Sequence, residues 1–315
     1  MSFDSTIGEI EAQQKDLPEY ARYLNALSLD PIDSGEPIFV GAGDSLACAQ
    51  FIERLKNFAP RSMDPYELSQ NPLFARDKIV FFISVSGRTR SNIEAARAVE
   101  GIAKETVAIT ANQDSQLAKT CSKTIQLKFR KLPGVTPGTN SFTSSLLACS
   151  RMFGSIHAQF DLVPRMARAN HWAERHSENA ETVHFLATGF LFPIAFYGAA
   201  KLPEFLGERA EYQLTEEFSH VNLFSMTKKD LAIILKYGSD PVGAKLCEEL
   251  NCQGFCAELL DLKEPGTDPL EAAVTYSIYF QYFALNAALR KGLRGPAFLE
   301  NSVLLEISNK MIYFG

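Results

Sequence analysis

The chain has 315 residues, of which 46% are hydrophobic and 22% are charged, a composition typical of a soluble globular protein of two ordinary domains. A net charge of −6 argues against a nucleic-acid partner, but it leaves room for a local basic pocket that binds a phosphate ester. No apolar run is long enough to span a membrane and no signal peptide is visible, so we expect no membrane partner and a cytoplasmic location.

The first half of the chain alternates between strand and helix patterns. Each apolar, β-branched run is followed by a segment with helical spacing, and this alternation predicts a parallel sheet covered by helices on both faces. A loop rich in proline and glycine, residues 132–140, precedes a long apolar helix. The expected strands are 37–43, 78–84, 106–110 and 124–127, and the expected helices are 6–29, 46–55, 91–103, 115–118 and 142–160.

The second half repeats this rhythm after a polar segment, residues 168–181, which we interpret as a linker. The repeat lies in the order of elements and not in residue identity. It predicts an α/β protein of two tandem doubly wound parallel-sheet domains, residues 1–167 and 168–315. The expected strands are 183–189, 231–235 and 257–262, and the expected helices are 193–206, 243–250 and 269–289.

The cysteines and glycines show no metal or dinucleotide pattern. Gly41-Ala42-Gly43 follows a strand, but the third glycine of a dinucleotide fingerprint would fall on Leu46. No cysteine pair has CxxC spacing and no histidine completes a zinc site, so we expect no metal, no cofactor and mostly buried thiols. The six cysteines are Cys48, Cys121, Cys149, Cys247, Cys252 and Cys256.

The most informative segment is Ser84-Val85-Ser86-Gly87-Arg88-Thr89, which we call the serine loop. It lies between an expected strand and an expected helix, where free N–H groups of the first helical turn attract an anion. Ser84, Ser86 and Thr89 add hydroxyl donors, and Gly87 lets the backbone approach closely. The loop lacks the Gly-Lys-Ser/Thr of nucleotide-triphosphate sites. The alternative is a serine-rich turn that only caps a helix.

The corresponding place in the second half is Lys236-Tyr237-Gly238-Ser239-Asp240. This segment lacks the repeated hydroxyls of the serine loop. We therefore expect one phosphate site per chain, built by the first half.

The motifs, taken in order, resemble the sugar isomerase (SIS) family in its double-domain form. The most similar pattern is that of the isomerase half of glucosamine-6-phosphate synthase and of related amino-sugar-phosphate deaminases. The resemblance covers nearly the whole chain and implies two flavodoxin- or Rossmann-like SIS domains. The motifs are Glu9-Ile10-Glu11-Ala12-Gln13-Gln14, Gly41-Ala42-Gly43-Asp44-Ser45, the serine loop, Thr136-Pro137-Gly138-Thr139-Asn140-Ser141-Phe142-Thr143, Lys201-Leu202-Pro203-Glu204, Glu217-Phe218-Ser219-His220 and Lys310.

The resemblance implies a phosphate site and a pocket around it. The residues that would hold the sugar phosphate are Ser45, Ser84, Ser86, Gly87 and Thr89, and those that would line the pocket are Gly43, Val85, Thr136, Gly138 and Thr139.

The resemblance also implies catalytic roles. Glu204 would be the base that moves a proton between C1 and C2, with Lys201 beside it, and Lys310 would contact the substrate. Partial burial, which raises the pKa of a glutamate, suits that base. His220 would open the sugar ring and reach the site of a neighbouring subunit, which implies a homodimer. Without the resemblance, the glutamate and both lysines read as surface groups and the histidine as a structural one.

Three positions depart from the family pattern. Val221-Asn222 follow His220 where Gly-Pro is common, Arg88 stands where an acidic residue is usual, and Asn140 stands where the synthase has a lysine. These departures concern the substrate more than the fold.

Together, these patterns favour an enzyme that needs no metal and acts on a phosphorylated sugar. The function we favour converts an amino-sugar phosphate to the ketose phosphate and ammonia. One alternative is an aldose–ketose hexose phosphate isomerase without deamination, and another is a phosphosugar sensor without catalysis.

Overall fold

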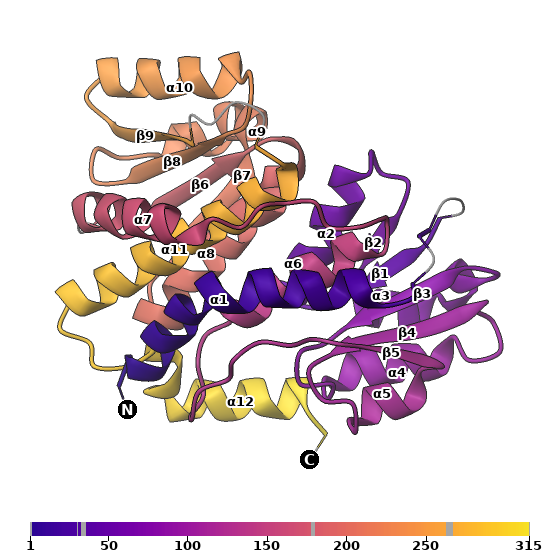
Figure 1. Cartoon of the computed structure of the whole chain (residues 1–315). Helices are drawn as coiled ribbons and strands as arrows, with labels where there is room; N and C mark the ends of the chain where they lie inside the picture. Colours follow the sequence, from indigo (N-terminus) through magenta and orange to yellow (C-terminus); the bar gives the residue numbers. More distant parts are fainter. Residues whose placement is uncertain (1, 30, 33–35, 178–179, 263–266, 315) are drawn as a thin grey trace. The chain divides into compact units, whose positions relative to one another are not determined.

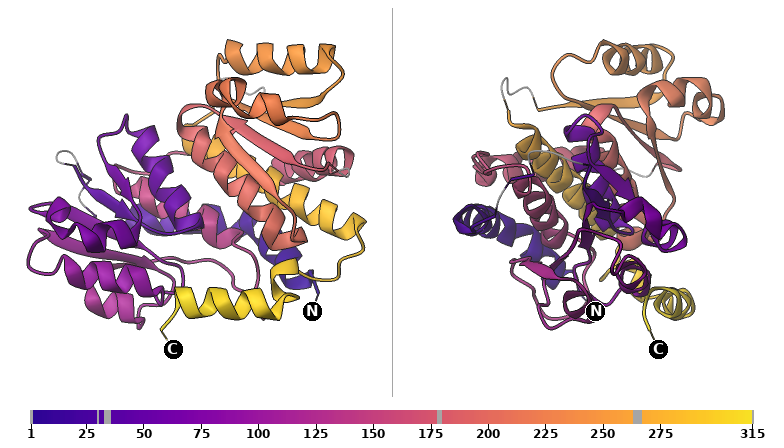
Figure 2. Two further views of the ribbon diagram at one scale, coloured as in Figure 1. Left: turned by 180° about the vertical axis from the view of Figure 1, so that it is seen from behind. Right: turned by 90° about the vertical axis from the view of Figure 1, so that its right-hand side faces the viewer.

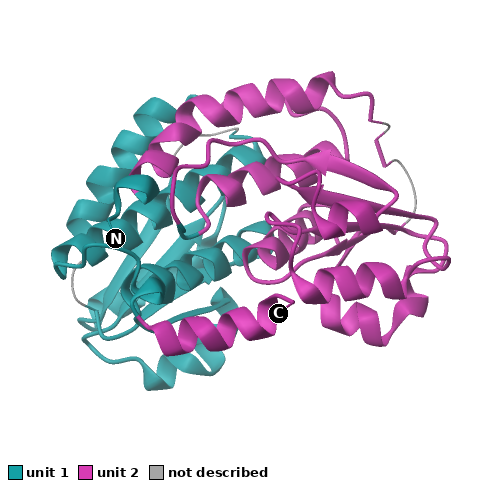
Figure 3. Cartoon of the chain, turned by 90° about the horizontal axis from the view of Figure 1, so that it is seen from below, with its two compact units in different colours: residues 1–6, 135–137, 161–300 teal, residues 7–134, 138–160, 301–315 magenta. Residues whose placement is uncertain are grey.

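The computed structural model describes residues 2–29, 31–32, 36–177, 180–262 and 267–314 (Figure 1). The chain divides into two compact units, shown in two colours in Figure 3. Unit 1 comprises residues 1–6, 135–137 and 161–300, and unit 2 comprises residues 7–134, 138–160 and 301–315. The chain thus enters unit 1, builds unit 2, returns to unit 1 and ends in unit 2.

Unit 2 contains a five-stranded parallel sheet of order β2-β1-β3-β4-β5. Its strands are β1 (Ile38–Val40), β2 (Arg61–Met63), β3 (Ile79–Ile83), β4 (Glu105–Thr110) and β5 (Lys123–Gln126). Its helices are α1 (Asp4–Ala26, which begins in unit 1), α2 (Asp44–Leu55), α3 (Pro65–Gln70), α4 (Arg90–Ala98), α5 (Gln116–Thr120), α6 (Asn140–Arg151) and α12 (Ser302–Ile312), with a 3-10 turn η1 (Pro72–Ala75).

The central strands of unit 2 are buried on both faces, which explains their nearly continuous apolar sequence. Val80 and Phe82 of β3 pack in one core with residues of α3, α4 and α5. On the opposite face, Phe39 and Phe81 stack with their ring centroids 4.6 Å apart, and Phe153 packs beside Phe39.

Unit 1 contains a four-stranded parallel sheet of order β7-β6-β8-β9, drawn in red and orange in Figure 2. Its strands are β6 (Val183–Ala187), β7 (Ala210–Leu214), β8 (Leu231–Lys236) and β9 (Cys256–Asp261). Its helices are α7 (Leu162–His176), α8 (Phe192–Leu206), α9 (Thr215–His220), α10 (Pro241–Cys252) and α11 (Pro269–Arg290), with 3-10 turns η2 (Gly189–Leu191), η3 (Asn222–Ser225) and η4 (Ala297–Leu299).

Helices cover both faces of this second sheet (Figure 1). Residues of α9 and α10 form one core with β6 and β8, whereas α7, α8 and α11 pack together on the other face. Gly198 of α8 is required there, because a Cβ would lie 2.6 Å from the Phe280 ring and 2.9 Å from the Phe185 ring. The predicted class, two tandem doubly wound parallel-sheet domains, is confirmed.

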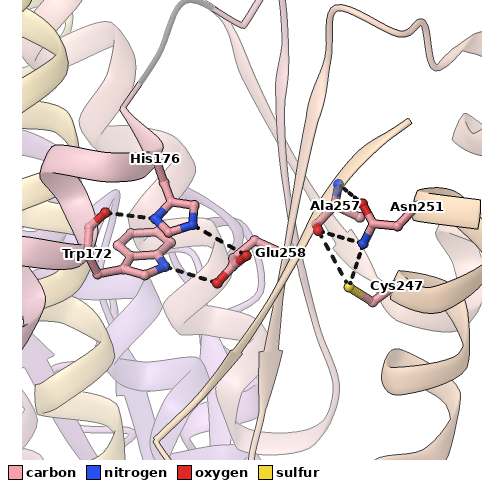
Figure 4. Close-up of polar contacts among 6 residues, drawn as sticks. All are labelled: Trp172, His176, Cys247, Asn251, Ala257 and Glu258. Carbon is pink, nitrogen blue, oxygen red and sulfur yellow. Dashed lines mark hydrogen bonds and ion pairs between the residues drawn. The ribbon is translucent and has the colours of Figure 1, made fainter. Parts of the chain in front are cut away.

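The edge strand β9 of unit 1 is held by a side chain of α10 (Figure 4). Asn251 Nδ2 donates to the Ala257 carbonyl at 2.9 Å, and the Ala257 N–H donates to Asn251 Oδ1 at 3.1 Å. The amide of Asn251 therefore pairs with this residue of β9 as a neighbouring strand would.

Two sequence predictions about helices were wrong. Residues 168–176 of the predicted linker belong to α7, and residues 178–179 lie outside the described residues. The segment is polar overall, but Leu162, Met166, Ala169, Trp172 and Ala173 recur at helical spacing and are buried. The predicted helix 142–160 begins at 140 and ends at Arg151, and Gly154 follows with a φ of 140°.

Other elements were missing from the prediction. The edge strands β2 and β7 are partly exposed and carry no clear apolar pattern, and α3, α9 and α12 are short or largely solvent-facing. The two units also differ from the predicted domains, 1–167 and 168–315. The chain passes from unit 2 to unit 1 at residue 161, and residues 301–315 belong to unit 2, which contains the first sheet.

Among the described residues, no helix is long and apolar enough to cross a membrane. Within the same residues, no group of three or more histidine, cysteine or acidic side chains could hold a metal ion. All six cysteines are free thiols. Cys48, Cys121, Cys149 and Cys247 are buried, whereas Cys252 and Cys256 are exposed.

Candidate active site

The topology of unit 2 creates a switch point between β1 and β3. These strands are parallel neighbours, and the chain proceeds from β1 toward β2 on one side and from β3 toward β4 on the other. Ligands of open α/β sheets bind beyond the carboxyl ends of such a strand pair. The segment containing Gly43 and Ser45 follows β1 and the serine loop follows β3, so both lie at this end of the sheet.

The serine loop is a compact turn closed by its own hydroxyls. Ser84 Oγ and Thr89 Oγ1 are 3.0 Å apart, and the Gly87 N–H contacts the Ser84 carbonyl at 3.0 Å and Ser84 Oγ at 3.2 Å. The Arg88 N–H donates to Ser86 Oγ at 3.2 Å. The predicted hydroxyls Ser84, Ser86 and Thr89 therefore gather within one turn.

Gly87 is required by both conformation and space. Its φ is +64°, in the left-handed region that favours glycine. A Cβ at this position would lie 2.1 Å from Ser115 Oγ and 2.9 Å from Thr110 Oγ1. Ser115 is the N-cap of α5, and its hydroxyl accepts from the Ala118 N–H at 3.2 Å, so it is not free to move away. Glycine allows the loop to pack directly against the start of α5.

The rest of the loop is anchored to β4. The Val85 carbonyl accepts from the Ala111 N–H at 3.0 Å and from Thr110 Oγ1 at 3.2 Å. These bonds fix the backbone of Val85 toward β4, and its side chain remains half-buried.

Two helices begin at this end of the sheet without a side-chain cap. Thr89 is the N-cap of α4, but its hydroxyl meets Ser84 and accepts no bond from the helix. Gly43 is the N-cap of α2, with a φ of 57°, and has no side chain to offer. Ser45 lies in the first turn of α2 and is half-buried. In α2, the Ser45 N–H contacts the Ala42 carbonyl at 3.2 Å and the Leu46 N–H contacts the Gly43 carbonyl at 2.9 Å. The first turn of α4, which no side chain caps, is therefore the one that can offer its N–H groups to an anion.

The proline- and glycine-rich loop is held by α1. Thr139 is buried, and its Oγ1 donates to Glu9 Oε2 at 3.3 Å, while the Leu132 N–H donates to Glu9 Oε1 at 3.2 Å. Gly138 is half-buried in unit 2, whereas Thr136 lies in the segment 135–137 that belongs to unit 1.

Residues 9–14 were identified in the sequence only as a motif, and their hydrogen bonds to distant residues were not predicted. Gln13 accepts from Thr143 Oγ1 at 2.8 Å, one turn of α1 beyond Glu9. One turn further, Asp16 Oδ2 accepts from the Arg130 N–H at 2.6 Å and from Asn140 Nδ2 at 2.7 Å. A side chain of α1 thus contacts Asn140, one of the three positions that depart from the family pattern. The signal in the sequence is the spacing of these polar residues on one face of a helix.

In unit 1, α8 brings Lys201 and Glu204 together. Lys201 Nζ donates to Glu204 Oε2 at 2.7 Å. The lysine side chain is fully buried, and its ammonium lies 4.6 Å from the Tyr197 ring centroid, whereas the glutamate side chain is 33% exposed. The lysine ammonium therefore fixes the position of the Glu204 carboxylate. The i, i+3 spacing along the helix explains the pairing.

His220 and Lys310 are both exposed. The His220 side chain, at the end of α9 in unit 1, is 68% exposed, and its Nε2 lies 3.2 Å from Glu216 Oε1. The Lys310 side chain, in α12 of unit 2, is 72% exposed, and its Nζ lies 2.6 Å from Glu306 Oε1. The chain beyond α12 is nevertheless packed, because Tyr313 forms an antiparallel β-bridge with Thr89.

Comparisons with known proteins identify a domain family and a shared fold. Residues 32–153 match the sequence model of the SIS domain family. No curated protein sequence matches the chain.

Several solved structures share its fold. Glucosamine-6-phosphate deaminase from Thermotoga maritima is 21% identical, with a TM-score of 0.78 over 92% of this chain and 96% of that one. The C-terminal domain of glucosamine-fructose-6-phosphate aminotransferase from Francisella tularensis is 18% identical, with a TM-score of 0.70 over 92% and 97%. Tagatose-6-phosphate ketose/aldose isomerase from Escherichia coli is 17% identical, with a TM-score of 0.69 over 92% of each chain.

The class that follows is an α/β protein with a SIS domain and two parallel sheets, each with a switch point between its central strands. The resemblance of the motifs to the SIS family is supported by the match of residues 32–153 to the sequence model of the SIS domain.

Proposed function

We propose that this protein is a phosphosugar isomerase of the deaminating kind, which converts an amino-sugar phosphate such as glucosamine 6-phosphate to the ketose phosphate with release of ammonia. The observation that carries the proposal is the serine loop at the switch point, followed by helix α4, whose start has no side-chain cap. The loop lies within the residues that match the SIS domain model. The similarity in fold to a glucosamine-6-phosphate deaminase supports the amino-sugar substrate.

The serine loop and Ser45 bind the phosphate in this proposal. Ser84, Ser86 and Thr89 provide hydroxyls, and the first turn of α4 provides N–H groups that attract negative charge. The packing of Gly87 against Ser115 fixes the loop before the ligand arrives, so little ordering is needed on binding. Gly43, Val85, Thr136, Gly138 and Thr139 line the rest of the pocket.

Glu204 carries out the proton transfer. In the open-chain aldose, its carboxylate removes the proton from C2, and the resulting enolamine receives a proton at C1. This leaves an imine at C2, to which water adds, and ammonia then leaves to give the ketose phosphate. One water is consumed for each ammonia released. Lys201, which donates to Glu204 at 2.7 Å, orients the carboxylate.

His220 and Lys310 complete the assignment. His220 opens the sugar ring in the site of a second copy, so the active protein is a homodimer. Its high exposure in the single chain, with Glu216 of its own helix as its described partner, is compatible with delivery to a neighbour. Lys310 contacts the substrate from α12, and its pairing with Glu306 leaves two ammonium N–H groups for a ligand.

The test is incubation of the purified protein with glucosamine 6-phosphate, following ammonia and fructose 6-phosphate together. We expect equal release of both, and we expect Glu204→Gln to lower kcat by about 10²- to 10⁴-fold with sugar-phosphate binding retained. Glu248→Gln, which changes an exposed acid of α10, is the matched control and should behave as wild type.

Other outcomes separate the alternatives. Interconversion of aldose and ketose phosphates without ammonia would favour a plain isomerase, the class of the tagatose-6-phosphate enzyme of similar fold. Binding of sugar phosphates without any turnover would favour a sensor. A Glu204→Gln variant with unchanged turnover would remove the assignment of the base. If light scattering shows only a monomer, the proposed role of His220 in the site of a second copy is contradicted.

A further inference from the structure

The last residues of unit 2 are joined to the serine loop by several contacts. Tyr313 and Thr89 form an antiparallel β-bridge, and Arg90 Nη2 donates to the Tyr313 carbonyl at 2.6 Å. The Arg88 guanidinium carbon lies 5.5 Å from the Tyr313 ring centroid, and that of Arg90 lies 5.2 Å from the Phe314 ring centroid. Three consecutive residues, 88–90, therefore contact the chain end.

Arg88 differs from the other cations near the loop. Lys310 pairs with Glu306, and Arg90 donates to the Tyr313 carbonyl. Among the described residues, Arg88 has no acidic partner within ion-pair distance, and its side chain is exposed. An aromatic ring contacts the flat face of a guanidinium and leaves its in-plane N–H groups free. Arg88 thus has a full set of donors available beside a loop that binds anions.

We propose that Arg88 is a further phosphate-binding residue of the serine loop, and that Tyr313 is the positioning residue that holds its guanidinium at the loop. The inference rests on the proposed phosphosugar function and deepens it. It also gives a role to Arg88, the position where the family usually has an acidic residue.

The physical argument concerns charge. The rest of the serine loop consists of hydroxyls, amides and apolar groups, which carry only partial charges. A phosphate monoester carries nearly two negative charges at neutral pH, and a guanidinium binds it with paired, charge-assisted hydrogen bonds. An exposed arginine loses side-chain entropy when it binds. Contact with Tyr313 restricts the side chain beforehand and so reduces that loss.

The experiment compares ligand affinity by calorimetry for wild type, Arg88→Gln and Arg97→Gln. Arg97 is an exposed residue in the last turn of α4, the helix that follows the loop, so its substitution makes the same change in charge away from the loop. For glucosamine 6-phosphate, Arg88→Gln should raise the dissociation constant about tenfold, or about 1.4 kcal/mol, and Arg97→Gln should leave it within twofold. The loss should shrink as salt is added. KM should rise with kcat unchanged, as for a contact made equally to substrate and transition state.

Variants of Tyr313 test the positioning role. Tyr313→Phe keeps the ring and should retain wild-type affinity, whereas Tyr313→Leu removes the ring and should raise the dissociation constant about threefold. In the Arg88→Gln background, Tyr313→Leu should add little, because the two residues act through one contact. A merely structural role for Tyr313 would give the same additional loss in both backgrounds.

The outcomes distinguish this proposal from the function on which it rests. If wild type binds neither glucosamine 6-phosphate nor fructose 6-phosphate, both the phosphosugar function and the Arg88 proposal are overturned. If wild type binds and Arg88→Gln matches Arg97→Gln, the phosphosugar function stands and the Arg88 proposal is overturned. If Tyr313→Leu and wild type bind equally well, Tyr313 has no positioning role.

Discussion

The serine loop and residues 236–240 occupy corresponding places in two parallel sheets that share the order of four strands, yet the helices after them begin in opposite ways. The serine loop follows β3, and residues 236–240 begin with the last residue of β8; both segments lie beside the switch point of their sheet and lead into a helix. In the first, the Thr89 hydroxyl turns to Ser84 and the start of α4 has no side-chain cap. In the second, Asp240 Oδ1 accepts from the Gly243 N–H at 2.9 Å at the start of α10.

This difference indicates that two helices placed alike by sheet topology can differ in how accessible their first-turn N–H groups are to an anion. The topology delivers a helix N-terminus to the end of the sheet, but the N-cap residue decides whether its N–H groups remain available. A carboxylate at that place satisfies the helix and repels a second anion. The single lysine of the second loop is also occupied, because Lys236 pairs with Asp261 at 2.9 Å.

The largest effect is expected from Gly87→Ala, compared with Gly238→Ala in the other loop. Both glycines have a φ of +64°, but a Cβ at Gly87 would lie 2.1 Å from Ser115 Oγ, whereas a Cβ at Gly238 has no atom within 4 Å. Gly238→Ala should cost about 1–2 kcal/mol from backbone strain alone. Gly87→Ala should cost more and should weaken sugar-phosphate binding at least about 100-fold, because the loop must shift. Denaturant titration and calorimetry measure both, and equal effects at the two positions would contradict the comparison.

Thr89→Asp should make α4 begin as α10 does. A carboxylate at the N-cap would bond to the first-turn N–H groups and repel phosphate, so we expect sugar-phosphate affinity to fall about tenfold or more. Thr89→Ser keeps a hydroxyl opposite Ser84 and is the control. Thermal unfolding of Thr89→Asp should show no loss of stability, because aspartate is a good N-cap residue. Retained affinity in this variant would mean that the phosphate does not lie at α4.

The converse change, Asp240→Ala, should affect stability and not binding. It removes the bond to the Gly243 N–H and should lower the free energy of unfolding by about 1 kcal/mol. Affinity for sugar phosphate should stay within twofold of wild type. A clear loss of affinity would show that the second loop also contributes to the phosphate site.

The smallest effect concerns pH and a contact in unit 1 (Figure 4). His176 Nε2 lies 3.4 Å from Glu258 Oε2, and Trp172 Nε1 donates to Glu258 Oε1 at 3.3 Å. The hydrogen bond to Glu258 raises the pKa of His176 above its ordinary 6.5, against the opposing effect of burial. The same bond lowers the pKa of Glu258 below its ordinary 4.5.

The direction of the pH dependence follows from these two pKa shifts. The stabilisation from His176 is complete below pH 6.5 and is lost as pH rises through the raised pKa of the folded state. The stabilisation from Glu258 is complete above pH 4.5 and is lost as pH falls through its lowered pKa. The pair therefore contributes most between pH 4.5 and 6.5.

His176→Gln should consequently lose more stability at about pH 6 than at about pH 9, by about 1 kcal/mol or less because the pair is partly exposed. Trp172 is the single tryptophan of the chain, so its fluorescence during denaturant unfolding follows unit 1. His171→Gln, at an exposed position on the same helix, is the control and should show little change. A deficit that is equal at both pH values would rule out the ion pair as its source.

What the sequence could predict depends on how local the signal is. The serine loop and its neighbouring strand and helix lie within about twenty residues, and their apolar and hydroxyl patterns predicted them directly. The helix α7 was missed because its polar residues outnumber the apolar stripe that buries it. The pairing of Lys201 with Glu204 follows from helical spacing, but their role came only from the family resemblance.

Contacts between distant parts of the chain could not be predicted in the same way. Arg90 and Tyr313 are 223 residues apart, and no sequence pattern at either position predicts contact with the other. Residues 311–314 are largely apolar, but that pattern does not identify the loop that Tyr313 contacts. The hydrogen bonds from Thr139 to Glu9 and from Asn140 to Asp16 likewise join residues about 130 and 124 positions apart.

The pairing of Asn251 with Ala257 has a consequence for how copies of this protein behave at high concentration. An open sheet edge offers unpaired backbone groups to which a strand from another molecule can add. Strand β9 is such an edge, and the Asn251 amide already occupies the N–H and C=O of Ala257. A strand from another molecule would have to displace both hydrogen bonds before it could pair with β9 at Ala257. One side chain of α10 thereby makes this edge a poor template for aggregation.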